Sequence, residues 1–397
     1  MSQSTPSQPV GPDSHPRPDS HPRPDSHPRP DSQHLSDAVA TTHWHLLDDG
    51  RIQCDVCPRA CRLHEGQRGL CFVRGRQDDM IVLHTWGRSS GFCVDPIEKK
   101  PLNHFLPGTS VLTFGTAGCN LSCRFCQNWD ISKSREMDTL ADAATPTRIA
   151  TVARELGCAS VAFSYNDPVV FFEYASDVAD ACHAVGVKTV AVSAGYMCAE
   201  PRRQFYRHID AANIDLKAFT DGFYRRVCAA RLDPVLDTLR YLVHETEVWV
   251  ELTTLLIPGE NDSDAELDAM TGWVVAELGP DVPMHFTAFH PDFKMLARSR
   301  TPATTLTRAR AIAVGNGVRF AYTGNVSDPA GSSTYCPACG LLVIERDWYE
   351  LGDWELTGDG ACMRCGSWLP GRFAGPPGTW GRHRLPVRLA GARGAGV

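Results

Sequence analysis

The chain has 397 residues, of which 43% are hydrophobic and 21% are charged, a composition typical of a water-soluble enzyme. Its formal net charge of −7 gives no electrostatic reason to expect nucleic acid or an anionic membrane as a partner. No apolar run approaches the roughly 18 residues of a membrane helix, and no secretory signal opens the chain. We therefore expect a cytoplasmic protein whose 16 cysteines serve as metal ligands rather than disulfides.

Residues 1–42 are predicted to form a disordered, low-complexity tail. The segment PDSHPR repeats three times from Pro12, and a segment rich in proline with few apolar residues cannot build a core. The repeated histidines could bind metal loosely, but a solvated arm is the favoured interpretation.

The following segment, residues 43–108, is rich in cysteine. Four cysteines fall within eighteen residues, at Cys54, Cys57, Cys61 and Cys71. Their clustering predicts a second metal site, which holds either zinc or an auxiliary iron–sulfur cluster, and the irregular spacing does not choose between the two metals.

Apolar, β-rich runs alternate with helical stretches over residues 109–328. The predicted strands are residues 110–116, 160–165, 187–194, 211–218, 248–258, 282–290 and 318–324. Helical periodicity is clearest over residues 147–157 and 234–245. Strands that are apolar on both faces and alternate with helices predict an α/β fold with a parallel sheet. We expect a partial (β/α)6-type, TIM-like barrel, with small cysteine-rich metal-binding appendages at both ends.

Polar residues close several of these strands. SYNDP (164–168) ends the second strand, Ser193 the third, DLK (215–217) the fourth and FHP (289–291) the sixth. One such residue is often only a loop cap. Several at the carboxyl edge of one barrel predict an active site there.

Three further cysteines follow the first strand. Cys119, Cys123 and Cys126 have the spacing CxxxCxxC, and soft thiolates select zinc, copper(I) or an iron–sulfur cluster. A four-iron cluster held by three cysteines keeps one iron open for a small molecule, which is the favoured interpretation. The alternative is a zinc site with a distant fourth ligand such as Cys93 or His104.

This triplet, with Phe125 before its third cysteine, resembles that of the radical S-adenosylmethionine (SAM) superfamily. CNLSCRFCQNWDIS (119–132) is similar to activating enzymes of glycyl-radical enzymes, including pyruvate formate-lyase activating enzyme. The pattern over roughly residues 50–372 resembles most closely the radical enzyme of the AmmeMemoRadiSam system. It adds the motifs CDVCPRACRLHEGQRGLCFVR, DPIEKKPLNHFLPG, SYNDP, DLKAF, LLIPGENDS, FHPDFKM and two CxxC pairs.

The resemblance implies an oxidoreductase with a [4Fe-4S] cluster and SAM as cofactors. One electron from the cluster cleaves the sulfonium bond, and the resulting 5′-deoxyadenosyl radical abstracts a hydrogen atom. The likeness to activating enzymes implies a protein substrate or the partner proteins of the system, and an electron donor such as flavodoxin or ferredoxin. A small-molecule substrate is one alternative, and a non-catalytic zinc-binding scaffold is another.

The resemblance also assigns cofactor-binding residues. Phe125 is expected near the adenine, and Asn166 and Asp167 take the place of the superfamily's Gly-Gly-Glu segment, which binds the methionine amino group. Ser193 replaces the usual Thr of the third strand, and His290 is expected near the adenosyl group. Each of these residues could instead be only structural.

Asp215 and Lys217 match the DxK that approaches the cofactor's carboxylate and ribose. Because they are two apart on a strand they share one face, with Leu216 on the other, and the alternative is that they simply pair with each other. Val192 stands where activating enzymes often have Asp, so the sequence gives no support for a bound monovalent cation.

The C-terminal region, residues 329–372, contains two CxxCG knuckles. Their four thiolates, from Cys336, Cys339, Cys362 and Cys365, predict a structural zinc ribbon or a rubredoxin-like iron site that delivers electrons. The single cysteines Cys158, Cys182, Cys198 and Cys228 are interpreted as small packing residues. Residues 373–397 are predicted to be a flexible tail.

Overall fold

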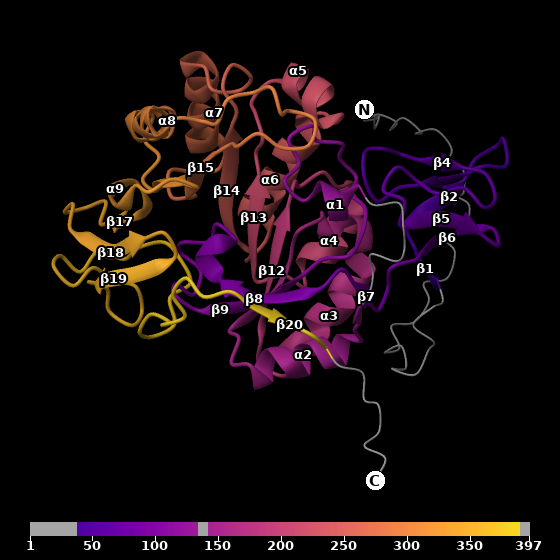
Figure 1. Ribbon diagram of the computed structural model, residues 1–397, viewed down its shortest axis with the longest axis horizontal. Coiled ribbons are helices and arrows are strands. Elements are labelled where there is room, and N and C mark those ends of the chain that lie inside the picture. The colour runs from indigo at the N-terminus through magenta and orange to yellow at the C-terminus, as the bar shows by residue number, and fades with distance from the viewer. Residues whose placement is uncertain (1–37, 134–141, 390–397) are drawn as a thin grey trace, which may run out of the picture. The chain divides into compact units, whose positions relative to one another are not determined.

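The computed structural model describes residues 38–133 and 142–389 (Figure 1). Most of the predicted disordered tail therefore lies outside the described residues. Its last residues do not fit the prediction, because Val39–Ala40 form strand β1, which pairs with β6 (Met80–Leu83). None of the helices in the described ranges has the length and apolar character needed to cross a membrane.

A sheet of nine strands forms the centre of the fold, in the order β16-β15-β14-β13-β12-β11-β9-β8-β20. Its parallel part is β9 (Ser110–Phe114), β11 (Ser160–Phe163), β12 (Lys188–Ser193), β13 (Ala211–Asp215), β14 (Trp249–Leu256), β15 (Met284–Ala288) and β16 (Ala321–Gly324). Every predicted strand is present, because strands buried on both faces carry the uninterrupted apolar runs seen in the sequence. The sheet ends at β16 and β20, which confirms the predicted partial barrel.

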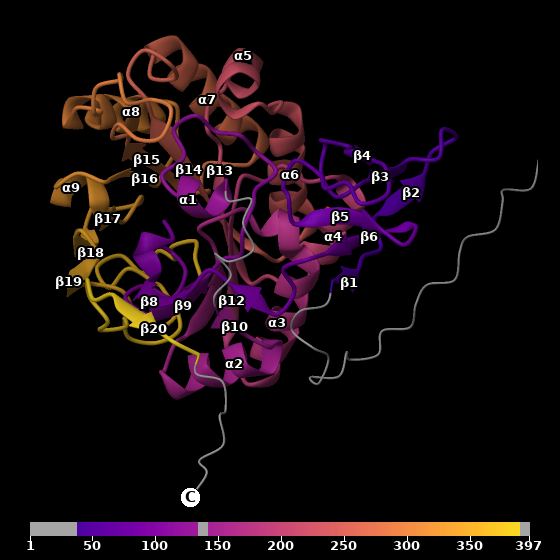
Figure 2. The ribbon, with the colours of Figure 1, turned by 45° about the vertical axis from the view of Figure 1, so that its right-hand side comes forward.

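The connecting helices cover this sheet. They are α2 (Pro146–Glu155), α3 (Phe172–Ala184), α4 (Ala199–Tyr206), α6 (Asp233–Glu245), α7 (Asp264–Glu277) and α8 (Ala303–Gly315). Capping residues mark where two of these helices begin. The side chains of Thr145 and Ser263 accept hydrogen bonds from the backbone N–H of Arg148 in α2 and of Glu266 in α7, the third residue of each helix. Helices α7 and α8 lie side by side next to β15 and β16 (Figure 2).

One end of the barrel is closed by the segment of residues 97–108. The carboxylate of Glu251, fully buried near the start of β14, accepts hydrogen bonds from the backbone N–H groups of Asn103 (2.9 Å) and His104 (2.7 Å). It is also bonded to His285 Nε2 (2.7 Å) and Trp249 Nε1 (3.0 Å). Since this floor lies at the amino ends of the strands, only the carboxyl ends are left to form a site.

Both cysteine-rich appendages contain small antiparallel sheets. The N-terminal one has β5 (Arg74–Gln77) with β6 and β1, and β2 (Trp44–Leu46), β3 (Ile52–Cys54) and β4 (Arg62–Leu63). The C-terminal one has β17 (Thr334–Tyr335), β18 (Leu342–Asp347) and β19 (Glu350–Trp354). The buried guanidinium of Arg346 joins the second appendage to the floor by donating to Thr334 Oγ1 (2.7 Å) and Asn103 O (2.8 Å).

The structure differs from the predicted flexible tail of residues 373–397. Leu385–Val387 form β20, which pairs antiparallel with β8 (Phe92–Pro96), and the backbone of Gly378 and Trp380 donates to Pro107 and Gly108. Without β20, strand β8 would leave a row of unpaired backbone groups at the sheet edge. The prediction is therefore wrong for residues 373–389, and residues 390–397 lie outside the described part of the chain.

Candidate active site

A cavity of about 410 Å³ opens at the carboxyl ends of the parallel strands. This volume lies within the range of small-molecule sites, roughly 300–1,000 Å³. Sequence-predicted residues from four separate segments line it: Cys119, Cys123, Phe125, Cys126, Asn166, Asp167, Ser193, Asp215 and Lys217. The fold therefore brings together the cysteine triplet and six of the seven residues that the resemblance assigned to the cofactor.

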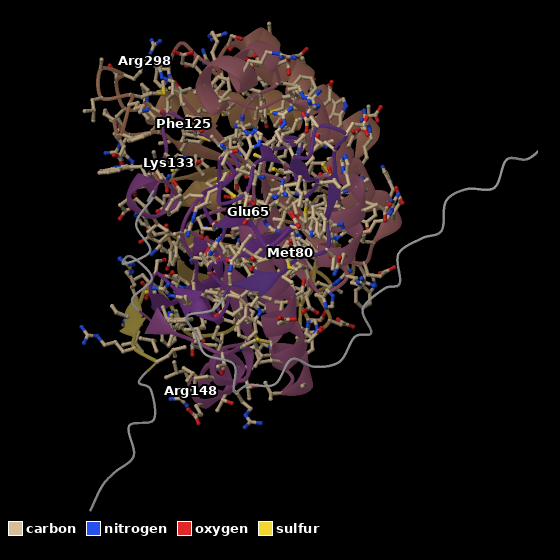
Figure 3. The ribbon with its side chains drawn as sticks, turned by 90° about the vertical axis from the view of Figure 1, so that its right-hand side faces the viewer. Glu65, Met80, Phe125, Lys133, Arg148 and Arg298 are labelled. Carbon is tan, nitrogen blue, oxygen red and sulfur yellow. The ribbon has the colours of Figure 1, made fainter. Side chains whose placement is uncertain are left out.

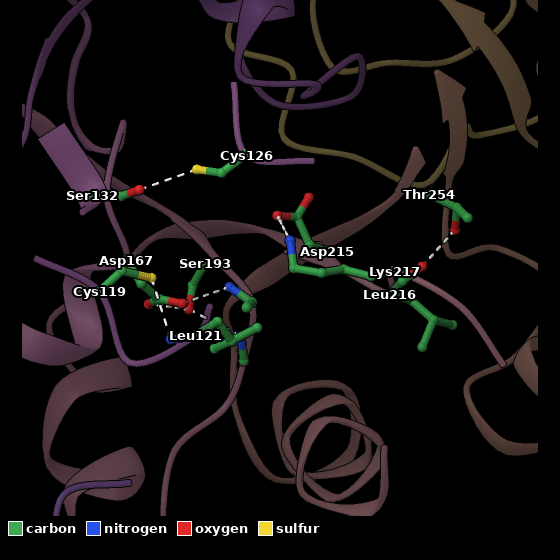
Figure 4. Close-up of polar contacts among 12 residues, drawn as sticks. Cys119, Leu121, Cys126, Ser132, Asp167, Ser193, Asp215, Leu216, Lys217 and Thr254 are labelled. Carbon is green, nitrogen blue, oxygen red and sulfur yellow. Dashed lines mark hydrogen bonds and ion pairs between the residues drawn. The ribbon is translucent and has the colours of Figure 1, made fainter. Parts of the chain in front are cut away.

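The loop that carries the triplet is fixed by its backbone. The N–H groups of Ser122 and Arg124 donate to the carbonyls of Cys228 and Val227, both at 2.9 Å, in the π-helical turn η4 (Tyr224–Cys228). The loop then continues into the short helix α1 (Trp129–Ser132), where Cys126 Sγ and Ser132 Oγ share a hydrogen bond of 3.1 Å (Figure 4). The hydrogen bonds of the loop thus hold three thiols toward one cavity.

The turn that leads into the triplet is held by the amide of Asn166. Its Oδ1 accepts from Thr116 N (2.9 Å), and its Nδ2 donates to Thr116 Oγ1 (3.2 Å), Ala117 O (3.1 Å) and Gly118 O (2.8 Å). Two glycines make this close approach possible. A Cβ at Gly115 would lie 2.6 Å from Asn166 Oδ1, and one at Gly118, whose φ is +76°, would lie 1.9 Å from the backbone oxygen of Cys71.

Positive charge surrounds the triplet. Burial raises the pKa of Cys119 to about 12, and the ammonium of Lys133 acts against this rise. The pKa of Cys123 is lowered, first by a hydrogen bond with the Cys228 thiol and then by Lys217 and Lys133. Phe125 and Lys133, both labelled in Figure 3, lie on the same cavity wall. A nearby cation favours the thiolate, which is the form that binds a metal.

Sequence reasoning missed several residues of this wall. Lys133, Lys99 and Lys100 all line the cavity. Cys228, which does not line it, was interpreted only as a packing residue although its thiol is hydrogen-bonded to the Cys123 thiol. The two adjacent lysines stand within the quoted motif DPIEKKPLNHFLPG, so the motif could have identified them. Cys228 had no such signal, because its position depends on the π-helical turn of η4.

Asp215 and Lys217 both face the cavity and are paired with each other. Lys217 Nζ donates to Asp215 Oδ2 at 2.7 Å (Figure 4). It also lies 5.8 Å from the centre of the Phe125 ring. Burial alone would lower the pKa of Lys217, but the carboxylate of Asp215 and the thiol of Cys123 raise it well above its usual value. The direction of this shift favours the ammonium form of Lys217. Leu216 between them is fully buried.

Asp167 and Ser193 are also joined to each other. Asp167 accepts from Ser193 Oγ (2.9 Å), Ala194 N (3.0 Å) and Val169 N (3.1 Å). These bonds tie the end of β12 to the loop after β11. Burial raises the pKa of Asp167, and the three hydrogen bonds limit that rise because they favour the carboxylate.

His290 does not line the cavity. It is exposed on the loop after β15, where its Nδ1 is 3.0 Å from Gln127 Nε2 of the cavity wall. The alternative fourth ligands also lie elsewhere. His104 is buried in the floor with its ring nitrogens bonded to Pro370 O (2.7 Å) and Tyr322 OH (2.6 Å), and Cys93 Sγ accepts from Arg384 Nε (3.2 Å). Neither residue reaches the triplet cavity in this structure.

The four C-terminal cysteines form a compact metal-binding set. All four sulfurs lie within 4.8 Å of one another, with 3.6 Å between Cys336 and Cys365 and 3.8 Å between Cys339 and Cys362. A Zn–S bond of about 2.3 Å places the sulfurs of a tetrahedral site about 3.8 Å apart. The arrangement therefore fits one tetrahedral ion. The knuckle glycines Gly340 and Gly366 have φ of +73° and +74°, as such turns require.

The four N-terminal cysteines line a second, small cavity. Cys54, Cys57, Cys61 and Cys71 all contribute to its wall. Among the described residues, the C-terminal set is the one group of three or more His, Cys, Asp or Glu residues whose possible ligand atoms all lie within 4.8 Å of one another. The N-terminal sulfurs do not meet this distance, so they are more widely spaced than the C-terminal sulfurs.

Comparisons with known proteins agree with this geometry. Residues 114–270 match the model of the radical SAM superfamily. The chain is 39% identical over 300 residues to the uncharacterized protein MJ0808 of Methanocaldococcus jannaschii, with 76% of this chain and 89% of the relative covered.

Two solved structures are also similar. A domain of a pyruvate-formate lyase-activating enzyme from Bacteroides vulgatus has a TM-score of 0.37 at 17% identity, with 42% of this chain and 99% of that chain covered. A radical SAM methyltransferase from Sphaerobacter thermophilus has a TM-score of 0.44 at 15% identity, with 76% and 80% covered.

The tight turn before the triplet gives a first prediction. Gly118→Ala should lower the free energy of unfolding by about 1–2 kcal/mol for its positive φ and by a further 1–3 kcal/mol, roughly, for the overlap with Cys71 O. Gly157→Ala is the matched control, because Gly157 has φ +67° but open space around it. Urea unfolding measures both variants, and equal losses would contradict the proposed close packing.

The C-terminal set gives a second prediction. The full-length Cys339→Ser/Cys362→Ser variant should lose one bound metal ion per chain, because a tetrahedral site cannot survive with two thiolates. Cys158→Ala, which removes a buried thiol outside the set, should keep it. Elemental analysis of the purified proteins is the measurement, and unchanged metal content in the double variant would rule out this site.

Proposed function

The chain belongs to the radical SAM superfamily, and from this premise we propose that it activates or modifies a protein substrate by hydrogen-atom abstraction. Cys119, Cys123 and Cys126 would hold a [4Fe-4S] cluster, and the cavity beside them would bind SAM. The observation that carries this proposal is the convergence of the three thiols with Asp215 and Lys217 on one cavity.

The residues around the triplet fit such a cluster. Three thiols leave one coordination position for a ligand from the cavity, and Lys133 and Lys217 offset the negative charge of the thiolates. When bound, the cluster and SAM supply the reducing electron and the carbon radical of the superfamily's chemistry. The chain's own part is to orient these groups and to keep water and stray C–H bonds away from them.

Within the cavity we assign SAM contacts to four residues. Lys217 would bind the cofactor's carboxylate, and Asp215 its ammonium or ribose hydroxyls, so that the pair seen here would open to the ligand. Phe125, a buried ring on the wall, would pack against the adenine. Asp167 has about one of its four acceptor positions unused, which suits one hydrogen bond from the amino group.

Asn166, Ser193 and His290 receive smaller roles. All of the amide hydrogens of Asn166 face protein oxygens, so we assign it to holding the loop, with one Oδ1 lone pair left for the cofactor. Ser193 would act through Asp167 by donating to it. His290 is exposed, and we place it at the rim, where it holds Gln127.

A protein substrate is supported by the surface next to the triplet. Trp129, the first residue of α1, is 44% exposed and stacks on Phe293 with ring centres 5.6 Å apart. Nearby Leu296 is 71% exposed. Large exposed apolar side chains beside a reactive cavity suit a macromolecular partner better than a small substrate. We also propose the partner proteins of the AmmeMemoRadiSam system and a flavodoxin or ferredoxin as interaction partners, on the sequence resemblance.

The metal of the C-terminal set is assigned to zinc with a structural role. The sulfur spacing suits zinc, and the knuckles lie in a small sheet that is anchored to the barrel floor through Arg346. The triplet cavity is lined by none of these four cysteines.

The central test is cofactor cleavage. Wild-type protein, reconstituted with iron and sulfide without oxygen, should release 5′-deoxyadenosine from SAM under dithionite. The triple variant Cys119→Ala/Cys123→Ala/Cys126→Ala should release none, because it cannot hold the cluster. Chromatography of the products measures this. If the triple variant still made 5′-deoxyadenosine, the assignment of the triplet would be wrong.

A second test concerns Lys217. Lys217→Ala should weaken SAM binding by about 1.5–3 kcal/mol, the contribution of a hydrogen bond to a charged group, which is roughly a ten- to hundredfold rise in Kd. Lys188→Ala removes a lysine that is ion-paired with Asp210 at the surface and should change nothing. Titration of SAM against the reduced cluster, followed by electron paramagnetic resonance, compares them. Equal affinities of wild type and Lys217→Ala for SAM would mean that the Asp215–Lys217 pair has only a structural role.

A further inference from the structure

A second group of four thiols lies outside the triplet cavity, in the N-terminal appendage. Cys54 is the last residue of β3, Cys57 and Cys61 belong to the turn between β3 and β4, and Cys71 follows on a separate loop. All four line one small cavity of about 20 Å³. Four thiols around one small space are the ligand set of an inorganic group rather than of an organic cofactor.

The backbone around these cysteines is built to hold them. Cys54 N donates to Cys61 O at 2.9 Å, which closes the turn. Ala60, directly before Cys61, and Phe72, directly after Cys71, have φ of +46° and +68°. Left-handed conformations at non-glycine residues are costly, and they persist where the surroundings over-determine them, typically at functional sites.

Two arginines, Arg59 and Arg74, line the same cavity. Arg74 is buried and donates to Val170 O (3.0 Å) and Glu173 Oε1 (3.0 Å), and Arg59 Nε donates to Asn120 O (2.7 Å). The Nη2 atom of Arg59 is buried and finds no hydrogen-bond partner within residues 38–133 and 142–389. A buried guanidinium nitrogen without an acceptor is costly, so the cavity lacks an anionic or hydrogen-bond-accepting group. Sulfides and thiolates of a cluster provide one.

The spacing of the sulfurs distinguishes a site for a single metal ion from a site for a cluster. The C-terminal set fits a single ion, and its sulfurs lie 3.6 Å apart in one pair and 3.8 Å apart in the other. The N-terminal sulfurs are not gathered in this way. Cysteines that bind different irons of a cluster do not share one ion, so their sulfurs lie farther apart than around a single ion. Four thiolates are the usual ligand set of such clusters.

This cavity lies directly behind the triplet loop. Asn120, between Cys119 and Leu121, is part of its wall, and the backbone of Cys71 touches Gly118. We propose that Cys54, Cys57, Cys61 and Cys71 hold a second, auxiliary iron–sulfur cluster, with Arg59 donating to it. This inference does not depend on the function proposed for the triplet.

Acid-labile sulfide tests the proposal, because a zinc or single-iron site contains none. After anaerobic reconstitution, the variant without Cys119, Cys123 and Cys126 should keep about half of the wild-type sulfide if both clusters are of the same type. Adding Cys57→Ser and Cys61→Ser should remove the remainder. Adding Cys182→Ala instead, a buried thiol on α3, should leave it unchanged.

Each outcome decides one point. Absence of sulfide from the triplet variant, or zinc that disappears together with Cys57 and Cys61, would overturn the auxiliary cluster. Equal sulfide in wild type and in the triplet variant would support the auxiliary cluster and would instead contradict the function proposed for the triplet. Because the deciding variant keeps the N-terminal cysteines, a folding defect caused by their removal cannot produce a false result.

Discussion

The hydrogen bonds of the Asn166 amide are the interaction on which the site depends. They fix the backbone of Thr116, Ala117 and Gly118, the turn through which β9 leads into the cysteine triplet. Glycine at positions 115 and 118 lets this turn lie against the neighbouring loop and the N-terminal appendage without overlap. Asn166, in the loop after β11, thereby sets the position of the cysteines that follow the adjacent strand β9. This is possible because β9 and β11 are parallel, so that their carboxyl ends lie at the same edge of the sheet.

The electrostatics of the cavity follow from this placement. Three thiols are brought into a partly buried space together with Lys99, Lys100, Lys133 and Lys217. Desolvation disfavours thiolates, and Lys133 and Lys217 offset that penalty. Lys100 and Lys217 have their own carboxylate partners in Asp95 (2.8 Å) and Asp215 (2.7 Å). Two of the lysines that line the cavity are therefore matched by carboxylates of the protein itself.

The floor of the barrel links the C-terminal cysteine-rich region to the site. Residues 97–108 are pinned inside the barrel by Glu251, and the same segment receives Arg346 and Arg372 of the C-terminal region. It also supplies Lys99 and Lys100 to the cavity. We expect changes at the C-terminal cysteines to reach the site through this segment, because these cysteines themselves are not part of the cavity wall.

The sequence by itself determined the strands, the parallel barrel and the triplet, because apolar runs and cysteine spacing are local patterns. It also predicted that Asp215, the last residue of β13, and Lys217 just beyond it share one face, since side-chain direction in an extended chain follows from alternation. Only the tertiary structure decided which polar residues hold the backbone and which are left for a ligand: Asn166 and Asp167 are largely engaged with the protein. The π-helical turn that brings Cys228 to Cys123, the docking of β20 on β8, and the wide spacing of the N-terminal sulfurs also depend on contacts between distant segments. A one-dimensional pattern does not contain such contacts, because they arise only when segments far apart in the chain pack together.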